Sequence, residues 1–331
     1  MVTAASTLIG CAQVQPATGD LVEQLRLLPI VDSVTGYATP GNPLEDPESS
    51  IDVSVKSDAD PKAIADMVGL WRDEVDALTG DVSLSVDQDH DDGTYATLSI
   101  DTRPDRDELV ALAEVWGTLA PQASSLDIYL DDYDPDTFAS VNVDVDPAAD
   151  LHEVLAGLAD SSADLNDTIS WSVSRSYPSQ FSFYSNDGLP DADTMDVVAG
   201  LGTALETEPT PVRIDVSSYT YDSTPRHLTA TIEFDPPGLS DVTDSDAEIR
   251  VRVDPVWLSM QTYVDRLPHD AVETSVDFQI FDYRVGGLDT ENCNYREANI
   301  TGPLTDDLWQ YWLRDGSASA DGSTAFACAS S

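Results

Sequence analysis

Hydrophobic and polar residues alternate strictly in a series of short segments along the chain. The alternation occurs in "IDVSV", "DVSLSV", "YATLSI", "SLDIYL", "FASVNVDV", "TISWSV", "QFSFY" and "VRIDV". Period-two alternation buries one face of a β-strand and leaves the other face in water. We therefore expect an antiparallel or mixed sheet that carries helices on one side only.

Apolar residues at helical spacing separate pairs of these segments. Pro61, Pro104, Pro147 and Pro190 recur in steps of 43 residues, and each precedes a helical pattern. Proline suits the first turn of a helix, where its missing N–H is not needed. The predicted apolar stripes are core positions: Ile64, Met67, Val68, Trp71, Val75 and Leu78; Leu109, Leu112, Trp116 and Leu119; Leu151, Val154, Leu155 and Leu158; Met195, Val198, Leu201 and Leu205.

The repeated unit is therefore strand, helix, strand, and two units give the order βαββαβ. That order is similar to the ferredoxin-like fold, in which strand twist favours right-handed crossovers. The predicted fold class is α+β, built from tandem ferredoxin-like two-layer repeats of about 43 residues per βαβ unit. Short polar links such as "DQDHDDG" are expected to join successive units as hairpins.

The repeat extends beyond these units at both ends. Residues 19–29 predict a helix and residues 30–38 a strand. Residues 248–254, a helix opened by Pro255, and one strand over "SVDFQIFDYRV" predict a divergent last repeat, followed by a short helix around Leu308, Trp309 and Trp312. The predicted domains are 1–11, an export signal; 12–50, a tether with a half repeat and a loop; 51–135 and 136–222, two βαββαβ modules; 223–285, the last repeat; and 286–331, a C-terminal extension.

The start of the chain carries a candidate lipid-attachment motif. Leu8, Ile9, Gly10 and Cys11 follow a short apolar patch and resemble the bacterial lipobox. The resemblance implies that the Cys11 sulfur carries diacylglycerol and that the peptide is cut before it. Acyl chains on Cys11 would hold the protein at the extracytoplasmic face of the membrane. The alternative is an ordinary buried thiol in an N-terminal strand.

The two remaining cysteines form an even pair if Cys11 is lipidated. Cys293 and Cys328 could close the C-terminal region with a disulfide, which an oxidising compartment permits. The alternative is two free thiols. Their spacing matches no zinc-site pattern.

The charge balance narrows the possible partners. The 331 residues include 62 Asp and Glu against 15 Lys and Arg, which gives a formal charge of -47. This field repels phosphate backbones and anionic lipid headgroups, so nucleic-acid binding is disfavoured and cationic partners are attracted. A strongly hydrated, solubilising surface also explains the excess of acid. The acidic lipobox-bearing chain resembles Asp-rich envelope lipoproteins of high-GC bacteria.

No catalytic or cofactor motif occurs in the sequence. HExxH, G-x-S-x-G, S-x-x-K, P-loop and Rossmann glycine patterns are all missing, and no cofactor is expected. Asp87, Asp89 and Asp91 imitate the start of an EF-hand loop. Asp92 replaces the turn glycine and Leu98 the closing glutamate, so a hairpin turn at Asp92-Gly93 is expected rather than a metal site.

These observations favour a non-catalytic, membrane-anchored extracytoplasmic lipoprotein that binds a protein or an envelope polymer. The alternatives are an envelope hydrolase with an Asp/Glu site between modules, and weak divalent-cation binding by acidic turns. Alternation predicts an exposed polar sheet face, and the residues expected on it are Ser83, Ser85, Tyr129, Tyr184, Asp215 and Tyr219.

Overall fold

The computed structural model describes residues 19–39, 48–76, 81–89, 93–130, 139–162, 169–177, 179–186, 188–203, 210–219, 227–235, 256–267, 273–280, 283–289 and 302–316. Over this part of the chain, strands β1 to β6 pair with one another in chain order, and so do strands β8 to β12. The chain divides into two compact units. Unit 1 comprises residues 1–146 and 160–172, and unit 2 comprises residues 147–159 and 173–331.

Unit 1 begins with a helical segment at residues 19–26. Its further elements are β1 (Val31–Thr39), β2 (Glu48–Val55), α2 (Pro61–Val75), β3 (Asp81–Asp89), β4 (Tyr95–Ile100), α3 (Arg106–Leu119), the 3₁₀ turn η1 (Ala120–Gln122), β5 (Ser125–Leu130) and β6 (Ala139–Asp144).

Unit 2 contains most of α4 (Leu151–Ser161), and β7 (Ile169–Arg175) contributes residues to both units. A helical segment covers residues 256–264. The other elements of unit 2 are β8 (Gln180–Ser185), α5 (Ala192–Gly202), β9 (Arg213–Tyr219), β10 (His227–Phe234), β11 (Glu273–Ile280), β12 (Tyr283–Asp289) and α7 (Thr305–Gly316).

Parallel and antiparallel pairings alternate within each unit. β2 and β3 are parallel around α2, β3 and β4 are antiparallel, and β4 and β5 are parallel around α3. In unit 2, β8 and β9 are parallel, β9 and β10 antiparallel, and β10 and β11 parallel. Gly93, at the predicted β3–β4 turn, has φ 88°, a left-handed conformation that glycine adopts without steric cost. Because parallel and antiparallel pairings alternate, the two strands that follow each of these antiparallel hairpins run opposite to the two strands before it.

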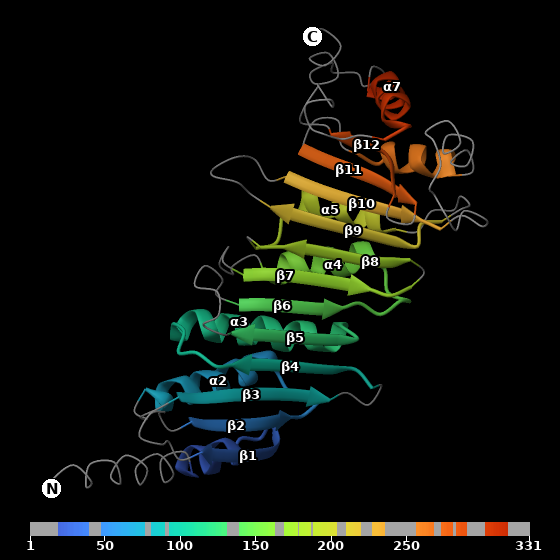
Figure 1. Cartoon of the computed structure of the whole chain (residues 1–331). Helices are drawn as coiled ribbons and strands as arrows, with labels where there is room; N and C mark the ends of the chain where they lie inside the picture. Colours follow the sequence, from blue (N-terminus) through green and yellow to red (C-terminus); the bar gives the residue numbers. More distant parts are fainter. Residues whose placement is uncertain are drawn as a thin grey trace, which may run out of the picture. The chain divides into compact units, whose positions relative to one another are not determined.

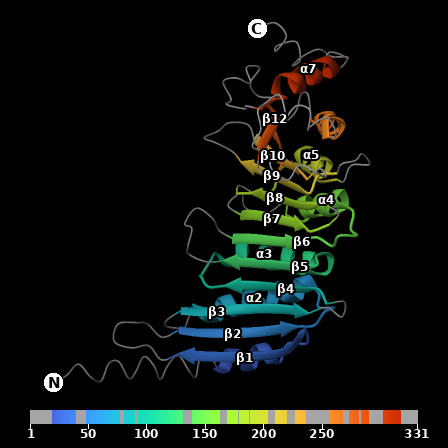
Figure 2. The same ribbon diagram turned by 45° about the vertical axis from the view of Figure 1, so that its right-hand side comes forward.

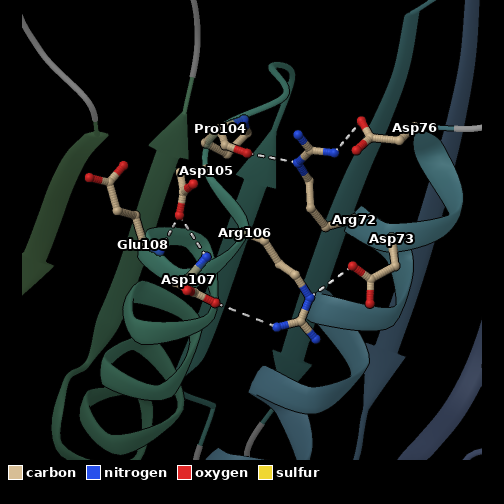
Figure 3. Close-up of polar contacts among 8 residues, drawn as sticks. All are labelled: Arg72, Asp73, Asp76, Pro104, Asp105, Arg106, Asp107 and Glu108. Carbon is tan, nitrogen blue, oxygen red and sulfur yellow. Dashed lines mark hydrogen bonds and ion pairs between the residues drawn. The ribbon is translucent and has the colours of Figure 1, made fainter.

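The helices of each unit lie on one side of its strands (Figures 1 and 2). In unit 1, polar contacts tie α2 to the start of α3 (Figure 3). Arg72 Nε donates to the Pro104 carbonyl at 2.7 Å, and Arg106 Nε lies 2.8 Å from Asp73 Oδ1. Asp105 caps α3 by accepting from the backbone N–H groups of Asp107 and Glu108. In unit 2, Arg266 donates to the carbonyls of Gly200 and Thr203 at the end of α5.

The expected ferredoxin-like strand order is not confirmed. That fold splits each βαβ unit by placing another strand between its two parallel strands. Here β2 and β3 are direct hydrogen-bonded neighbours, and so are β4 and β5. The structure therefore confirms the repeating α+β architecture with a mixed sheet, but each crossover connects adjacent strands.

The expectation of uniformly right-handed crossovers is wrong for unit 1. α2 and α3 cover the same face and advance in the same direction across the sheet, yet the strands that they connect run in opposite directions. Two such crossovers must have opposite hands, although nearly all parallel crossovers are right-handed. The physical reason is that Leu84, Leu98 and Ile128 are buried on one face, so both helices have to cover that face.

The described residues of the predicted stripes are buried except for Val154, which is half-buried, and Leu78 and Leu205 lie outside the described residues. Trp71, Trp116 and Trp171 are almost fully buried, as predicted. Helices begin near all four prolines, but only in α2 is the proline itself the first residue. In α3 and α5 the helix starts after an aspartate cap, Asp105 or Asp191. Aspartate at these positions satisfies N–H groups that the first turn leaves without partners.

The segment predicted as one strand over "SVDFQIFDYRV" forms two antiparallel strands, β11 and β12. No glycine or proline separates them, and the apolar pair Ile280-Phe281 is the only break in the alternation of this segment, so the sequence pattern gives little sign of the turn. Gly286 on β12 packs against α7, where an added Cβ would lie 2.8 Å from Leu308 Cδ1. The predicted strand over residues 248–254 lies outside the described residues.

Candidate binding surface on the sheet

Each unit has a sheet face opposite its helices, which we call the open face. On β3, Val82, Leu84 and Val86 are buried toward the helices, whereas Ser83 and Ser85 alternate with them and are only half-buried. The other four residues predicted for this face also alternate with buried neighbours. Tyr129 on β5 joins the two serines in unit 1, and Tyr184 on β8 with Asp215 and Tyr219 on β9 lie in unit 2. Their placement agrees with the prediction, and their role in binding stays a prediction.

A transverse row of two carboxylates and one hydroxyl crosses the open face of unit 1. Strand pairing aligns Asp87 on β3 with Thr97 on β4, and Thr97 with Asp127 on β5. Thr97 Oγ1 donates to Asp87 Oδ1 at 3.0 Å. Two strand spacings put the Cα atoms of Asp87 and Asp127 about 10 Å apart. Thr97 therefore stands between the two aspartates, which are next-nearest neighbours across the strands.

The charged side chains that act on the two carboxylates of this row are aspartates, so the local electrostatic field is negative. Burial raises the pKa of Asp87, and the charges of Asp52 and Asp89 raise it further, against the lowering effect of the Thr97 hydrogen bond. Burial also raises the pKa of Asp127, with contributions from Asp144 and Asp87. The six strands β1 to β6 contain no lysine, arginine or histidine. Negative charge on this face is therefore not neutralised by a basic side chain from its own strands.

Exposed tyrosines accompany these carboxylates. Tyr95 is 48% exposed and pairs in register with Asp89, and Tyr129 is 43% exposed and lies two residues from Asp127 on the same face. Tyr37 on β1 is 62% exposed. Burial raises the pKa of Tyr129, and the neighbouring charges of Asp127 and Tyr95 add to this effect. Aromatic rings thus alternate with carboxylates and hydroxyls over the open face of unit 1.

The open face of unit 2 has a similar row, but the carboxylates of this row are paired with arginine. Asp215, Thr231 and Asp277 are aligned across β9, β10 and β11. Arg213 Nε lies 2.6 Å from Asp215 Oδ2, and Ser182 Oγ donates to Asp215 Oδ1 at 2.5 Å.

The second carboxylate of this row also has a cationic partner, because Arg284 pairs with Asp277. Burial raises the pKa of Asp277, and Arg284 counteracts this shift. Both carboxylates of the unit 2 row are therefore paired with arginine.

Sequence reasoning did not assign Asp127, Tyr37 or Tyr95 to the open face, and it considered Asp87 only as part of a turn. Asp87 stands two residues after Ser85, and Asp127 stands two residues before Tyr129. Period two alone could have placed both on the same face as the predicted residues. What alternation cannot show is that strand pairing aligns them through Thr97.

The described residues contain no group of three or more His, Cys, Asp or Glu side chains that could hold a metal ion. Among the same residues, no helix is both long and apolar enough to cross a membrane. Cys11, Cys293 and Cys328 lie outside the described residues.

Comparison of the chain with protein-family models, with curated proteins and with solved structures found no match.

Proposed function

We propose that this chain is a non-catalytic lipoprotein, anchored through Cys11 at the extracytoplasmic face of the membrane, that binds a protein or an envelope polymer through the open face of its sheet. The observation that carries the binding proposal is the exposure of tyrosines on a face that is rich in hydroxyls and carboxylates. Tyrosine provides a large, rigid contact area with a polar tip, and it is enriched in binding surfaces.

The one-sided construction of the units supports this proposal. Helices bury the apolar face of the strands, so a partner can bind the other face without disturbing the core. The open-face residues of β3, β4 and β5 lie on strands whose positions are fixed by hydrogen bonding to both neighbours. A surface on such rigid elements loses little conformational freedom when it binds.

Cosedimentation with an insoluble cell-envelope fraction tests the proposal. We expect the purified full chain to sediment with the fraction, and the Tyr95→Ala/Tyr129→Ala variant to be retained about tenfold less, because exposed aromatic contacts are often decisive in binding. Tyr177→Ala is the control, since Tyr177 is 67% exposed but lies outside the strands. Equal retention of both variants would contradict the proposed surface. Prior protease treatment of the fraction separates a protein partner from a polymer.

A further inference from the structure

We infer that the open face of unit 1 docks an extended, arginine-containing segment of a partner protein, and that the open face of unit 2 does not. This inference rests on the proposed function and specifies its partner. It follows from a contrast between two rows of the same design: Asp87, Thr97 and Asp127 in unit 1, and Asp215, Thr231 and Asp277 in unit 2.

The two rows differ in whether basic side chains of the chain itself pair with their carboxylates. In unit 2, arginine side chains already occupy the carboxylates of Asp215 and Asp277. In unit 1, no ion pair joins Asp52, Asp87 or Asp127 to a basic side chain among the described residues. Unit 2 therefore shows which side chain suits such a row. The unit 1 face is complementary to the same cation supplied by another molecule.

The neighbouring tyrosines favour arginine over lysine or a metal ion. Tyr95 lies opposite Asp89, and Tyr129 lies beside Asp127, so an aromatic ring stands next to a carboxylate at two places. A guanidinium group can pair with a carboxylate and stack on an aromatic ring at the same time, which a hydrated ammonium group does less well.

The spacing of the carboxylates favours an extended chain. Asp87 and Asp89 stand two residues apart on β3, which separates their Cα atoms by about 7 Å. Alternate side chains of an extended peptide have the same spacing, so successive outward-facing arginines can meet successive aspartates. A peptide that crosses the strands instead meets Asp87 and Asp127 at about 10 Å. Both paths present flat, repeated contacts rather than a single deep pocket.

The expected affinity is modest and depends on salt. Each exposed ion pair contributes little by itself, so binding requires several pairs together with tyrosine contacts. The formal charge of -47 attracts any cationic peptide toward the whole molecule, and added salt screens this attraction. A test must therefore separate contacts on the open face from the diffuse field.

A titration with a defined peptide makes this separation. The probe is a short fluorescein-labelled peptide of alternating arginine and serine, and its anisotropy is followed with the full chain at about 0.15 M salt. Asp87→Asn/Asp127→Asn removes two charges from the open face. Asp66→Asn/Glu114→Gln removes two charges from exposed positions on α2 and α3 of the same unit.

We expect the open-face variant to weaken binding about tenfold and the helix variant by less than about twofold. Tyr129→Ala should also weaken peptide binding. Equal effects of the two charge variants would overturn the inference, because they would mean that only the net charge attracts the peptide. Equal binding of an alternating glutamine and serine peptide would overturn it as well.

Hydrogen exchange with and without the arginine peptide locates the contact. We expect peptide-dependent protection on β3, β4 and β5, and protection on β9, β10 and β11 instead would contradict the inference. Cosedimentation with the envelope fraction that persists while no arginine peptide binds would reject the basic partner and leave the proposed function standing. Thermal unfolding of each variant confirms that the substitutions leave the fold intact.

Discussion

Gly117 on α3 lies directly against Pro61, the first residue of α2, and a Cβ atom at position 117 would stand 2.9 Å from Pro61 Cα. The contact involves the backbone of α2, which cannot rotate away as a flexible side chain can. The two helices therefore approach closely because position 117 has no side chain. This approach lets α2 and α3 cover one sheet face side by side.

Gly117→Ala should lower the free energy of unfolding by about 1–3 kcal/mol, the usual range for overpacking a tight contact. Gly200→Ala is the matched control, because Gly200 is also helical and an added Cβ there meets nothing within 4 Å. We expect Gly200→Ala to raise stability by about 0.5–1 kcal/mol through its better helix propensity. Chemical denaturation of both variants measures the difference, and a neutral Gly117→Ala would contradict the close contact.

Trp116→Ala should cost about 3–5 kcal/mol of unfolding free energy, since Trp116 is fully buried and its removal leaves a cavity. Its indole Nε1 is buried without a hydrogen-bond partner among the described residues. Trp116→Phe therefore removes an unsatisfied donor along with some volume, and we expect a cost well below that of alanine. Denaturant midpoints of the two variants test this order, and equal costs would show that ring packing is not the main contribution.

Asp127→Asn should stabilise the protein at neutral pH. The folded pKa of Asp127 is raised, so the folded chain binds more protons than the unfolded chain between the two pKa values. Above both values the native carboxylate opposes folding, and this cost is present in full at pH 7. The gain should stay below about 1 kcal/mol because the side chain is partly exposed. It should shrink as the pH falls through the raised pKa, and it should vanish below the ordinary value of 3.8. Thermal unfolding across this pH range checks the sign, and a gain that increases toward acidic pH would refute it.

Cys11→Ala should move the protein from the detergent phase to the aqueous phase in a partition experiment on exporting cells. The expected cause is the loss of the acyl chains that hold a lipoprotein at the membrane. Mass spectrometry of the wild-type N-terminal peptide provides an independent measurement. Equal aqueous partitioning of wild type and variant would end the lipid-anchor proposal, while the sheet surface would stand unaffected.

Calcium should bind weakly, at many sites, and less strongly as sodium chloride is raised past physiological concentration. The 62 carboxylates gather divalent ions diffusely, and salt screens this attraction. The aspartate-rich sequence around Asp87, Asp89 and Asp91 lacks the glycine and the closing glutamate of an EF-hand loop. Calorimetric titration at low and high salt is the measurement. One saturable site of micromolar affinity that survives high salt would favour a specific cation-binding role.

Sequence patterns predicted the local structure better than the connections between elements. Period-two segments and apolar stripes correctly predicted the strands and helices that contain Trp71, Trp116 and Trp171. They could do so because a buried position requires an apolar residue, whatever the order of the elements. The strand order escaped prediction, since Leu84 and Ile128 would be apolar whichever strand lay between them. Likewise, the hand of a crossover leaves no trace in the pattern of its helix.

The candidate surface was predictable only in part. Alternation placed Ser83, Ser85 and Tyr129 on the open face, and the structure agrees with that placement. The row of Asp87, Thr97 and Asp127 depends on register between strands, which residue types alone do not determine. In so acidic a chain, a single aspartate carries little information until its neighbours in space are known.

The reversal of strand direction at every hairpin has a consequence for how such a chain can change length. Within unit 1, one repeat step of 44 residues leads from Leu84 on β3 to the equivalent Ile128 on β5, which runs in the opposite direction. Duplication or deletion of one βαβ unit would reverse the direction of every strand that follows. The loops of those strands would then lie at the opposite ends of the strands. Only the gain or loss of an even number of βαβ units preserves the direction of the following strands. A gene that encodes this architecture can therefore lengthen or shorten without reversing strands only by two units at a time.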